Sequence, residues 1–223
     1  MGYTTTFTGA FHLNKPLDPA LETFFKRFSQ TRHVRRDIAV IKAMDPEWKE
    51  HCFKGDLGES GAYYLPPATL TKDQIQSGSL FMRLPSGDGP FDNKFGQVLD
   101  RSVINNNQPP AEMPGLWCQW LVHGDSIEWD GMEKFYNYVE WLEYILKHFL
   151  IPEGYVVNGS VKWQGEEAAD TGIITVTNNK VSVKEGKSDP LSLFSDEELL
   201  EELKKRNPRL VRYAEALLQK QAD

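Results

Sequence analysis

Cysteine, long apolar runs and a leader segment are what this chain most clearly lacks. It has two cysteines, Cys52 and Cys118, in 223 residues, whereas a secreted, loop-rich fold held by disulfides carries several pairs. No apolar run approaches the roughly 18 residues that cross a membrane. The opening residues, MGYTTTFTGAFHLNK, lack the basic and apolar regions of a signal peptide. We therefore expect a protein of a reducing cytoplasm with no membrane partner.

Positive charge is also in short supply. The 25 lysines and arginines stand against 32 aspartates and glutamates, giving a net charge of −7 and an isoelectric point near 5.3. Non-specific binding to nucleic acid is therefore not expected. With 40% hydrophobic residues the chain has enough apolar material for a core, and its length suits one large domain with or without an appendage.

Recognisable catalytic and metal-binding motifs are absent too. The five histidines form no HxH or HExxH pattern and the cysteines no CxxC pair, so a zinc site is not expected. A nucleophile elbow, a P-loop and a GxGxxG motif are missing as well. His51 and Cys52 are sequence neighbours, which rarely form a catalytic pair because folds usually supply base and nucleophile from different elements. We predict no metal and no cofactor, and we favour a protein that is not an enzyme.

Local patterns predict the secondary structure of the first third of the chain. Apolar and polar residues alternate from Tyr3 to Leu13, which predicts a half-buried strand. Asp18 and Pro19 have the positions of a helix N-cap and a first-turn proline. The residues that follow repeat at helical spacing and form one apolar face: Leu21, Phe24, Phe25 and Phe28. From about residue 37 to 113, prolines and glycines interrupt the chain, so we predict a long irregular insertion, a common place for specificity.

The centre of the chain, residues 115–165, is rich in aromatic residues. Asp130 and Glu133 have the spacing of a capping box, which predicts a helix from Asp130 to Leu150 that ends before a proline. Alternation predicts further strands over residues 116–122, 127–129, 161–164, 173–177 and 181–183.

In this order the elements predict an α+β fold, an antiparallel sheet with helices on one face. The order fits a ferredoxin-like core, in which split β-α-β units interleave, with an extra hairpin. We assign residues 1–186 to this domain and residues 187–223 to a C-terminal helical appendage. In the appendage Ser195 begins a capping box and Pro208 separates two helices, which predicts a helical hairpin.

The central helix carries a second aromatic face that a sheet does not require. Trp141, Tyr144 and His148 follow Asn137 at helical spacing, with Tyr136 beside them. This face must meet the insertion, the C-terminal hairpin, another subunit or a ligand. Because Trp and Tyr favour interfaces, we take these residues and Trp117 as candidate binding residues.

A basic run is the second candidate site. Arg32, His33, Arg35 and Arg36 follow the first helix, where they suit a phosphate group or, alternatively, the helix dipole and nearby carboxylates. Two acidic sets are interpreted as capping or solvated loop residues rather than metal ligands: Glu128/Asp130/Glu133 and Glu166/Glu167/Asp170.

Several runs of the sequence resemble an uncharacterised family of bacteriophage and prophage proteins. They are PGLWCQW at 114–120, EWDG at 128–131, EKFYNYVEWL at 133–142, NGxVxWxGE at 158–166 and DxGxI at 170–174. The resemblance covers mainly residues 114–183 and the N-terminal strand and helix. No activity is established for that family, so it supplies no functional residues. It implies a phage gene product that acts in the bacterial host cytoplasm, where small accessory phage proteins often bind and disable host or defence components.

Three functions are therefore compatible with the sequence. The leading hypothesis is a phage-type accessory protein, for host takeover or anti-defence, that binds a host or defence protein or a nucleotide. The second is an enzyme acting on a nucleotide or nucleic acid, with its site in the insertion. The third is a structural or assembly protein, a homo-oligomer whose contacts come from the C-terminal helices.

Overall fold

The first strand lies where hydrophobic alternation predicts it, and the sheet is built on both sides of it. A computed structural model describes residues 2–67, 80–81, 99–186, 201 and 203–207. Strand β1 (Thr6–Leu13) pairs antiparallel with two neighbours, and Phe11 lies opposite Ile127 in one and Gly159 in the other. This strand is therefore central to the fold.

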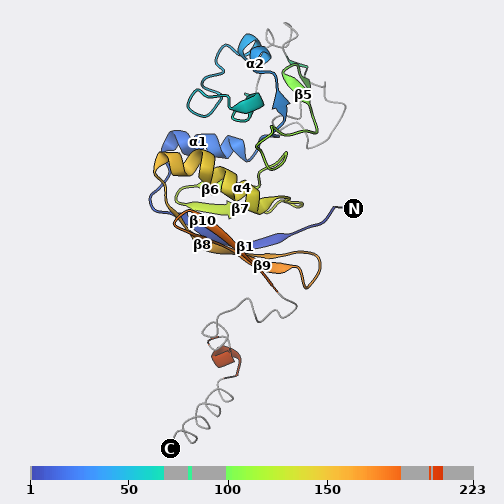
Figure 1. Ribbon diagram of the computed structural model, residues 1–223. Helices are drawn as coiled ribbons and strands as arrows, with labels where there is room; N and C mark the ends of the chain where they lie inside the picture. Colours follow the sequence, from blue (N-terminus) through green and yellow to red (C-terminus); the bar gives the residue numbers. More distant parts are fainter. Residues whose placement is uncertain (1, 68–79, 82–98, 187–200, 202, 208–223) are drawn as a thin grey trace, which may run out of the picture.

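The sheet has six strands in the order β10-β9-β8-β1-β7-β6. Every neighbouring pair is antiparallel, and α1 and α4 lie together on one face (Figure 1). The α+β class and the antiparallel sheet are thus confirmed, as is the order of the elements along the chain. The remaining strands are β6 (Trp120–His123), β7 (Ser126–Trp129), β8 (Val157–Gln164), β9 (Thr171–Thr177) and β10 (Lys180–Glu185).

The starts of two strands differ most from the prediction. β6 begins four residues later than expected, at Trp120, because the carbonyl of Leu116 accepts from the His33 amide instead of from a sheet strand. β8 begins four residues earlier, at Val157. The sequence does not predict this extension because Gly159 interrupts the alternating pattern. Its φ is +136°, and a Cβ there would lie 2.7 Å from the Ala10 carbonyl oxygen. The close approach of β1 and β8 requires glycine at this position.

Helix α1 (Pro19–Phe28) agrees with the prediction in its start and its buried face. The Asp18 carboxylate accepts from the Ala20 amide at 2.9 Å, so the predicted N-cap is confirmed. The predicted apolar residues are the buried ones: Leu21, Phe24, Phe25 and Phe28.

The second long helix begins later than predicted. α4 spans Tyr138–Ile145 and continues through a π-helical turn, η3 (Leu146–Leu150), and a 3-10 turn, η4 (Ile151–Glu153). The expected capping box is wrong: Asp130 accepts from the Met132 amide at 2.8 Å, which closes a local turn. Lys134 and Asn137 then take positive φ values of 64° and 54°, which an α-helix does not allow. The α- and π-helical part ends at Leu150, as predicted, but a 3-10 turn carries the helix on past Pro152.

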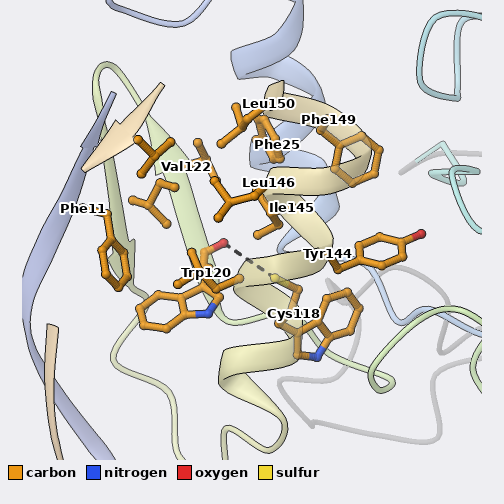
Figure 2. Packing of buried hydrophobic residues seen from close by; sticks show 14 of the residues in the cluster. Phe11, Phe25, Cys118, Trp120, Val122, Tyr144, Ile145, Leu146, Phe149 and Leu150 are labelled. Atoms are coloured by element: carbon orange, nitrogen blue, oxygen red, sulfur yellow. Dashed lines mark hydrogen bonds between the residues drawn. The ribbon is translucent and has the colours of Figure 1, made fainter. Parts of the chain in front are cut away.

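The main core lies between the sheet and the two helices (Figure 2). Phe11 from β1 and Trp120 from β6 face α4 and η3, with their ring centroids 5.7 Å apart. The Trp120 indole also donates to the Tyr138 carbonyl at 2.7 Å, at the first residue of α4. Cys118 is fully buried beside this cluster, and burial raises the pKa of its thiol, so we interpret it as a packing residue.

The insertion forms a second, smaller body on the far side of α1 from the sheet (Figure 1). Its own core consists of Ile41, Cys52, Leu57 and Tyr64. Two short two-stranded sheets belong to it, β2 with β5 and β3 with β4. Its elements are β2 (Arg35–Arg36), α2 (Ile38–Met44), η1 (Glu59–Gly61), β3 (Leu80–Phe81), β4 (Leu99–Asp100) and β5 (Val103–Asn105).

Only part of the C-terminal appendage can be compared with the prediction. Glu201 and residues 203–206 are helical, whereas the capping box at Ser195 and the helix expected after Pro208 lie outside the described residues. Among the residues that the structure describes, none belongs to a helix with the length and hydropathy needed to cross a membrane.

Candidate functional site

The second aromatic face of α4 is buried. The exposed fraction of Trp141 is 0% and that of Tyr144 is 5%. His33 lies against Trp141 with ring centroids 5.3 Å apart, and Tyr144 stacks on His148 at 4.3 Å. The segment after α1 and the insertion therefore cover this face, which was one of the four alternatives. One polar atom stays unmatched, because the buried Nε1 of Trp141 has no hydrogen-bond partner among the described residues.

A polar seam joins the insertion to this part of the helix. The Tyr63 hydroxyl lies 2.8 Å from Nδ1 of His148, and Glu112 lies 3.8 Å from Nε2. Burial lowers the pKa of His148 and raises the pKa of Tyr63 and of Tyr144. These shifts favour a neutral imidazole and protonated phenols, so the seam holds two segments together without charge on its rings.

The basic run does not form one surface. His33 is buried and its Nε2 donates to the Phe28 carbonyl at 3.1 Å. Burial lowers its pKa to about 3, so the ring is neutral at pH 7. Arg36 is also buried, donates to the Ser102 hydroxyl at 2.9 Å and lies over the Tyr64 ring. Arg35 beside it is half-buried in β2.

Arg32 and Trp117 are the two predicted binding residues that do meet near the surface. The guanidinium carbon lies 5.8 Å from the centre of the Trp117 ring. It is held there by the Asn106 carbonyl at 2.9 Å and the Asn107 side-chain oxygen at 3.1 Å. Tyr136, 55% exposed, lies apart in the loop before α4.

In the acidic set Glu166/Glu167/Asp170, carboxylates accept hydrogen bonds from other parts of the chain. Asp170 accepts from the Tyr3 hydroxyl and from the Trp163 indole, at 2.5 and 3.2 Å, and Glu166 accepts from the Thr4 amide. These bonds tie the start of the chain to the β8–β9 hairpin. Within the described part of the chain, no group of three or more His, Cys, Asp or Glu side chains is placed to hold a metal ion.

A cleft of about 530 Å³ lies between α1, residues 50–54 of the insertion and the segment after η4. Its apolar lining includes Leu21 and Phe24 of the helix and Phe53 and Leu65 of the insertion. Polar and charged groups also reach it: Lys15, Asp18, Thr23, Arg27, Glu50, His51, Lys54, Glu153 and Tyr155.

His51 in the cleft wall is held by a buried carboxylate. Nδ1 of His51 lies 2.7 Å from Oδ2 of Asp45, and the Tyr64 hydroxyl donates to the same oxygen at 2.9 Å. Oδ1 of Asp45 accepts from the Glu47 amide at 3.0 Å. Asp45 is 3% exposed, so its charge is stabilised by these hydrogen bonds rather than by water.

The cationic side chains of the cleft differ in the groups with which they interact. Lys54 pairs with Glu153, and Arg27 on α1 donates to the carbonyl oxygens of Leu65 and Pro66, which ties the insertion to the helix. Lys15 lies over the Tyr155 ring at 4.6 Å. In the described ranges no carboxylate pairs with Lys15.

Cys52, which also lines the cleft, is a poor nucleophile. Burial raises the pKa of its thiol to about 11, and its Sγ donates to the Lys49 carbonyl at 3.5 Å. A thiol with this pKa is protonated at neutral pH. The partner of His51 is thus Asp45, six positions earlier, and not its sequence neighbour.

Several residues of the cleft carry no motif in the sequence. Lys15 and Glu50 lie on two different segments, and neither they nor Asp45, the partner of His51, stand at a diagnostic spacing. The one usable signal is His51, whose partner depends on how α2 and the turn after it fold back.

No protein-family model, curated protein or solved structure matches this chain. The geometry of the cleft is therefore the observation from which a function is argued.

Proposed function

We propose that this protein acts by binding, and that it captures a nucleotide in the cleft between α1 and residues 50–54. The observation that carries the proposal is the cleft itself, whose volume of about 530 Å³ falls in the range of about 300–1,000 Å³ typical of small-ligand sites. Apolar side chains and a larger number of polar and charged groups line it together, so it suits a ligand with both kinds of surface.

The chemistry of the lining favours a nucleotide over other small ligands. Phe24 and Phe53 supply aromatic surface on which a planar base packs. Lys15, with no carboxylate partner in the described ranges, is a donor for a phosphate oxygen. A ligand with a flat apolar ring and an anionic group would contact both the aromatic surface and Lys15.

The burial of the second aromatic face weakens the alternative of a protein partner. A docking surface needs exposed anchors, and Trp141 and Tyr144 are in the core. Arg32 and Trp117 remain half-exposed, but together they are small for a stable interface.

We also propose that the chain is a phage-type accessory protein of the bacterial cytoplasm. The resemblance of residues 114–183 to bacteriophage and prophage proteins supports this context. Capture of a nucleotide would take a host or defence component out of use without any reaction.

We further infer that the core of the sheet is ferredoxin-like. The support is the strand order β8-β1-β7-β6, with α1 between β1 and β6 and α4 between β7 and β8 along the chain. Two interleaved split β-α-β units give this order. Strands β9 and β10 then extend one edge.

Titration calorimetry of the full chain with nucleoside mono-, di- and triphosphates tests the binding function. We expect saturable binding that Lys15→Ala weakens about tenfold, the effect of one lost charge-assisted hydrogen bond. Lys184→Ala, at an exposed position of β10 that does not line the cleft, is the charge-matched control. Equal affinities of the two variants, or no binding of any nucleotide, would refute the proposal. A new ³¹P signal during incubation would show turnover and favour the enzyme alternative.

A further inference from the structure

The wall of the cleft formed by residues 50–54 presents hydrogen-bond acceptors to a ligand. We infer that His51 and Glu50 read the nucleobase and select one that carries an amino group. This inference rests on the proposed capture of a nucleotide and adds which bases the cleft accepts. His51 is then a specificity-determining residue and Asp45 the residue that positions it.

The carboxylate of Asp45 determines which ring nitrogen of His51 carries the hydrogen. An ionised carboxylate only accepts hydrogen bonds, so the 2.7 Å contact between Oδ2 and Nδ1 requires a hydrogen on Nδ1. In the neutral imidazole Nε2 is then an acceptor. The described residues give Nε2 no hydrogen-bond partner, and His51 lines the cleft. In the neutral form of the ring, Nε2 is therefore an acceptor that a ligand can use.

The ring is held in this orientation before any ligand arrives. Asp45 is buried and receives three hydrogen bonds, from His51, Tyr64 and the Glu47 amide. Tyr64 is itself part of the small core of the insertion, so its hydroxyl is held in place beside Asp45. A polar group fixed in this way loses little freedom on binding, which raises the selectivity of its hydrogen bond.

Glu50 adds a second acceptor to the same wall. Its side chain lines the cleft and is exposed, and no cation pairs with it in the part of the chain that the structure describes. Lys15, on the connection between β1 and α1, is a donor over Tyr155. The cleft thus offers acceptors from one segment and a donor from another.

These groups match a nucleotide whose base is a hydrogen-bond donor. The exocyclic amino groups of adenine, cytosine and guanine donate N–H bonds to acceptors such as Nε2 and a carboxylate. Hypoxanthine and uracil have a carbonyl in the place of this amino group. Its oxygen would face Nε2 of His51 or the Glu50 carboxylate, and none of these acceptors would then receive a hydrogen bond. We expect amino bases to bind about tenfold more tightly than their carbonyl counterparts, since one net hydrogen bond contributes about that factor.

Two matched pairs of nucleotides test this selectivity, AMP against IMP and CMP against UMP, by calorimetry on the full chain. We expect the tighter binding of AMP and CMP to disappear in His51→Ala, while the affinity for IMP and UMP stays within about twofold. His12→Ala, an exposed histidine on β1, is the control and keeps the preference. Glu50→Gln, at an exposed position, reduces it in part and gives an answer even if His51→Ala does not fold.

The outcomes separate the two proposals. If no nucleotide binds the wild-type chain, both fail. If nucleotides bind through Lys15 but AMP and IMP are alike, or if the preference survives in His51→Ala, selection by His51 is wrong and nucleotide capture stands. The tautomer has its own measurement in the ¹⁵N spectrum of the histidine rings. A hydrogen on Nε2 instead of Nδ1 in the neutral His51 ring would also overturn the inference.

Discussion

The aromatic face of α4 and the 50–54 wall of the cleft both lie where the insertion meets the helices. They differ in whether their polar side-chain atoms have hydrogen-bond partners within the protein. On the helix face, polar side-chain atoms form hydrogen bonds within the protein, as between the Tyr63 hydroxyl and His148. On the wall, the buried partner of His51 fixes one ring nitrogen, and the other has no hydrogen-bond partner among the described residues. Aromatic density therefore identifies where segments pack, whereas a half-satisfied polar group marks the wall at which we propose that a ligand binds.

The largest expected effect is on the helix face. Trp141→Ala should lower the free energy of unfolding by about 3–5 kcal/mol, because it removes a fully buried indole and leaves a cavity. Urea denaturation followed by far-UV circular dichroism measures this. Trp141→Phe, which keeps a ring and removes the unmatched Nε1, should cost clearly less. Equal losses in the two variants would mean that the ring does not carry the packing.

Asp45→Ala should have the next largest effect, a loss of about 3 kcal/mol. It leaves three donors without their acceptor: Nδ1 of His51, the Tyr64 hydroxyl and the Glu47 amide. The variant should also lose the preference for amino bases, since the His51 tautomer is no longer held. Tyr64→Phe keeps the contact between Asp45 and His51 and should retain that preference. Loss of the preference in Tyr64→Phe as well would contradict the role of the carboxylate.

Acid should destabilise the helix face through His33. Its pKa is lowered to about 3 in the folded chain against about 6.5 in an unfolded one, so the unfolded state binds the proton first as the pH falls. The stabilisation is complete above pH 6.5 and is lost progressively down to about pH 3. Between pH 6.5 and 5 we expect a loss of about 2 kcal/mol from this residue. Denaturation at several pH values should show a shallower slope for His33→Ala than for His12→Ala.

Tyr136→Ala should change least. Tyr136 is 55% exposed, and substitutions at such positions usually stay within about 0.5 kcal/mol. Nucleotide affinity should be unchanged too, because the residue does not line the cleft. A clear loss of affinity in calorimetry would move the candidate site back towards the start of α4.

The sequence predicts those parts of the fold that depend on neighbouring residues. The N-cap at Asp18 and the helical face of α1 follow from local side-chain chemistry. The same chemistry misleads at Asp130. An aspartate that accepts from an amide two residues on can close a turn or begin a helix, and here Gly131 and Lys134, both at positive φ, decide for the turn.

The candidate site depends on contacts that are remote in sequence. The second face of α4 is correctly predicted to be apolar, but its burial depends on His33, 108 positions before Trp141, and on Tyr63, 85 positions before His148. The cleft combines segments near residues 15, 24, 51 and 155. Neither spacing nor composition predicts such a combination, because it exists only after the insertion packs against α1.

The two bonds from Arg27 to the Leu65 and Pro66 carbonyls connect ligand capture to the opening of the insertion. Separating the insertion from α1 must break these bonds and also dismantle the cleft, so ligand and guanidinium oppose the same opening equilibrium. Bound nucleotide should therefore slow amide hydrogen exchange in residues 50–65 more than in the sheet, by an amount that grows with its concentration above Kd. In Arg27→Ala the ligand-free chain would open more often, so amide exchange in residues 50–65 would be faster. The same nucleotide would then lower the rate of this exchange by a larger amount.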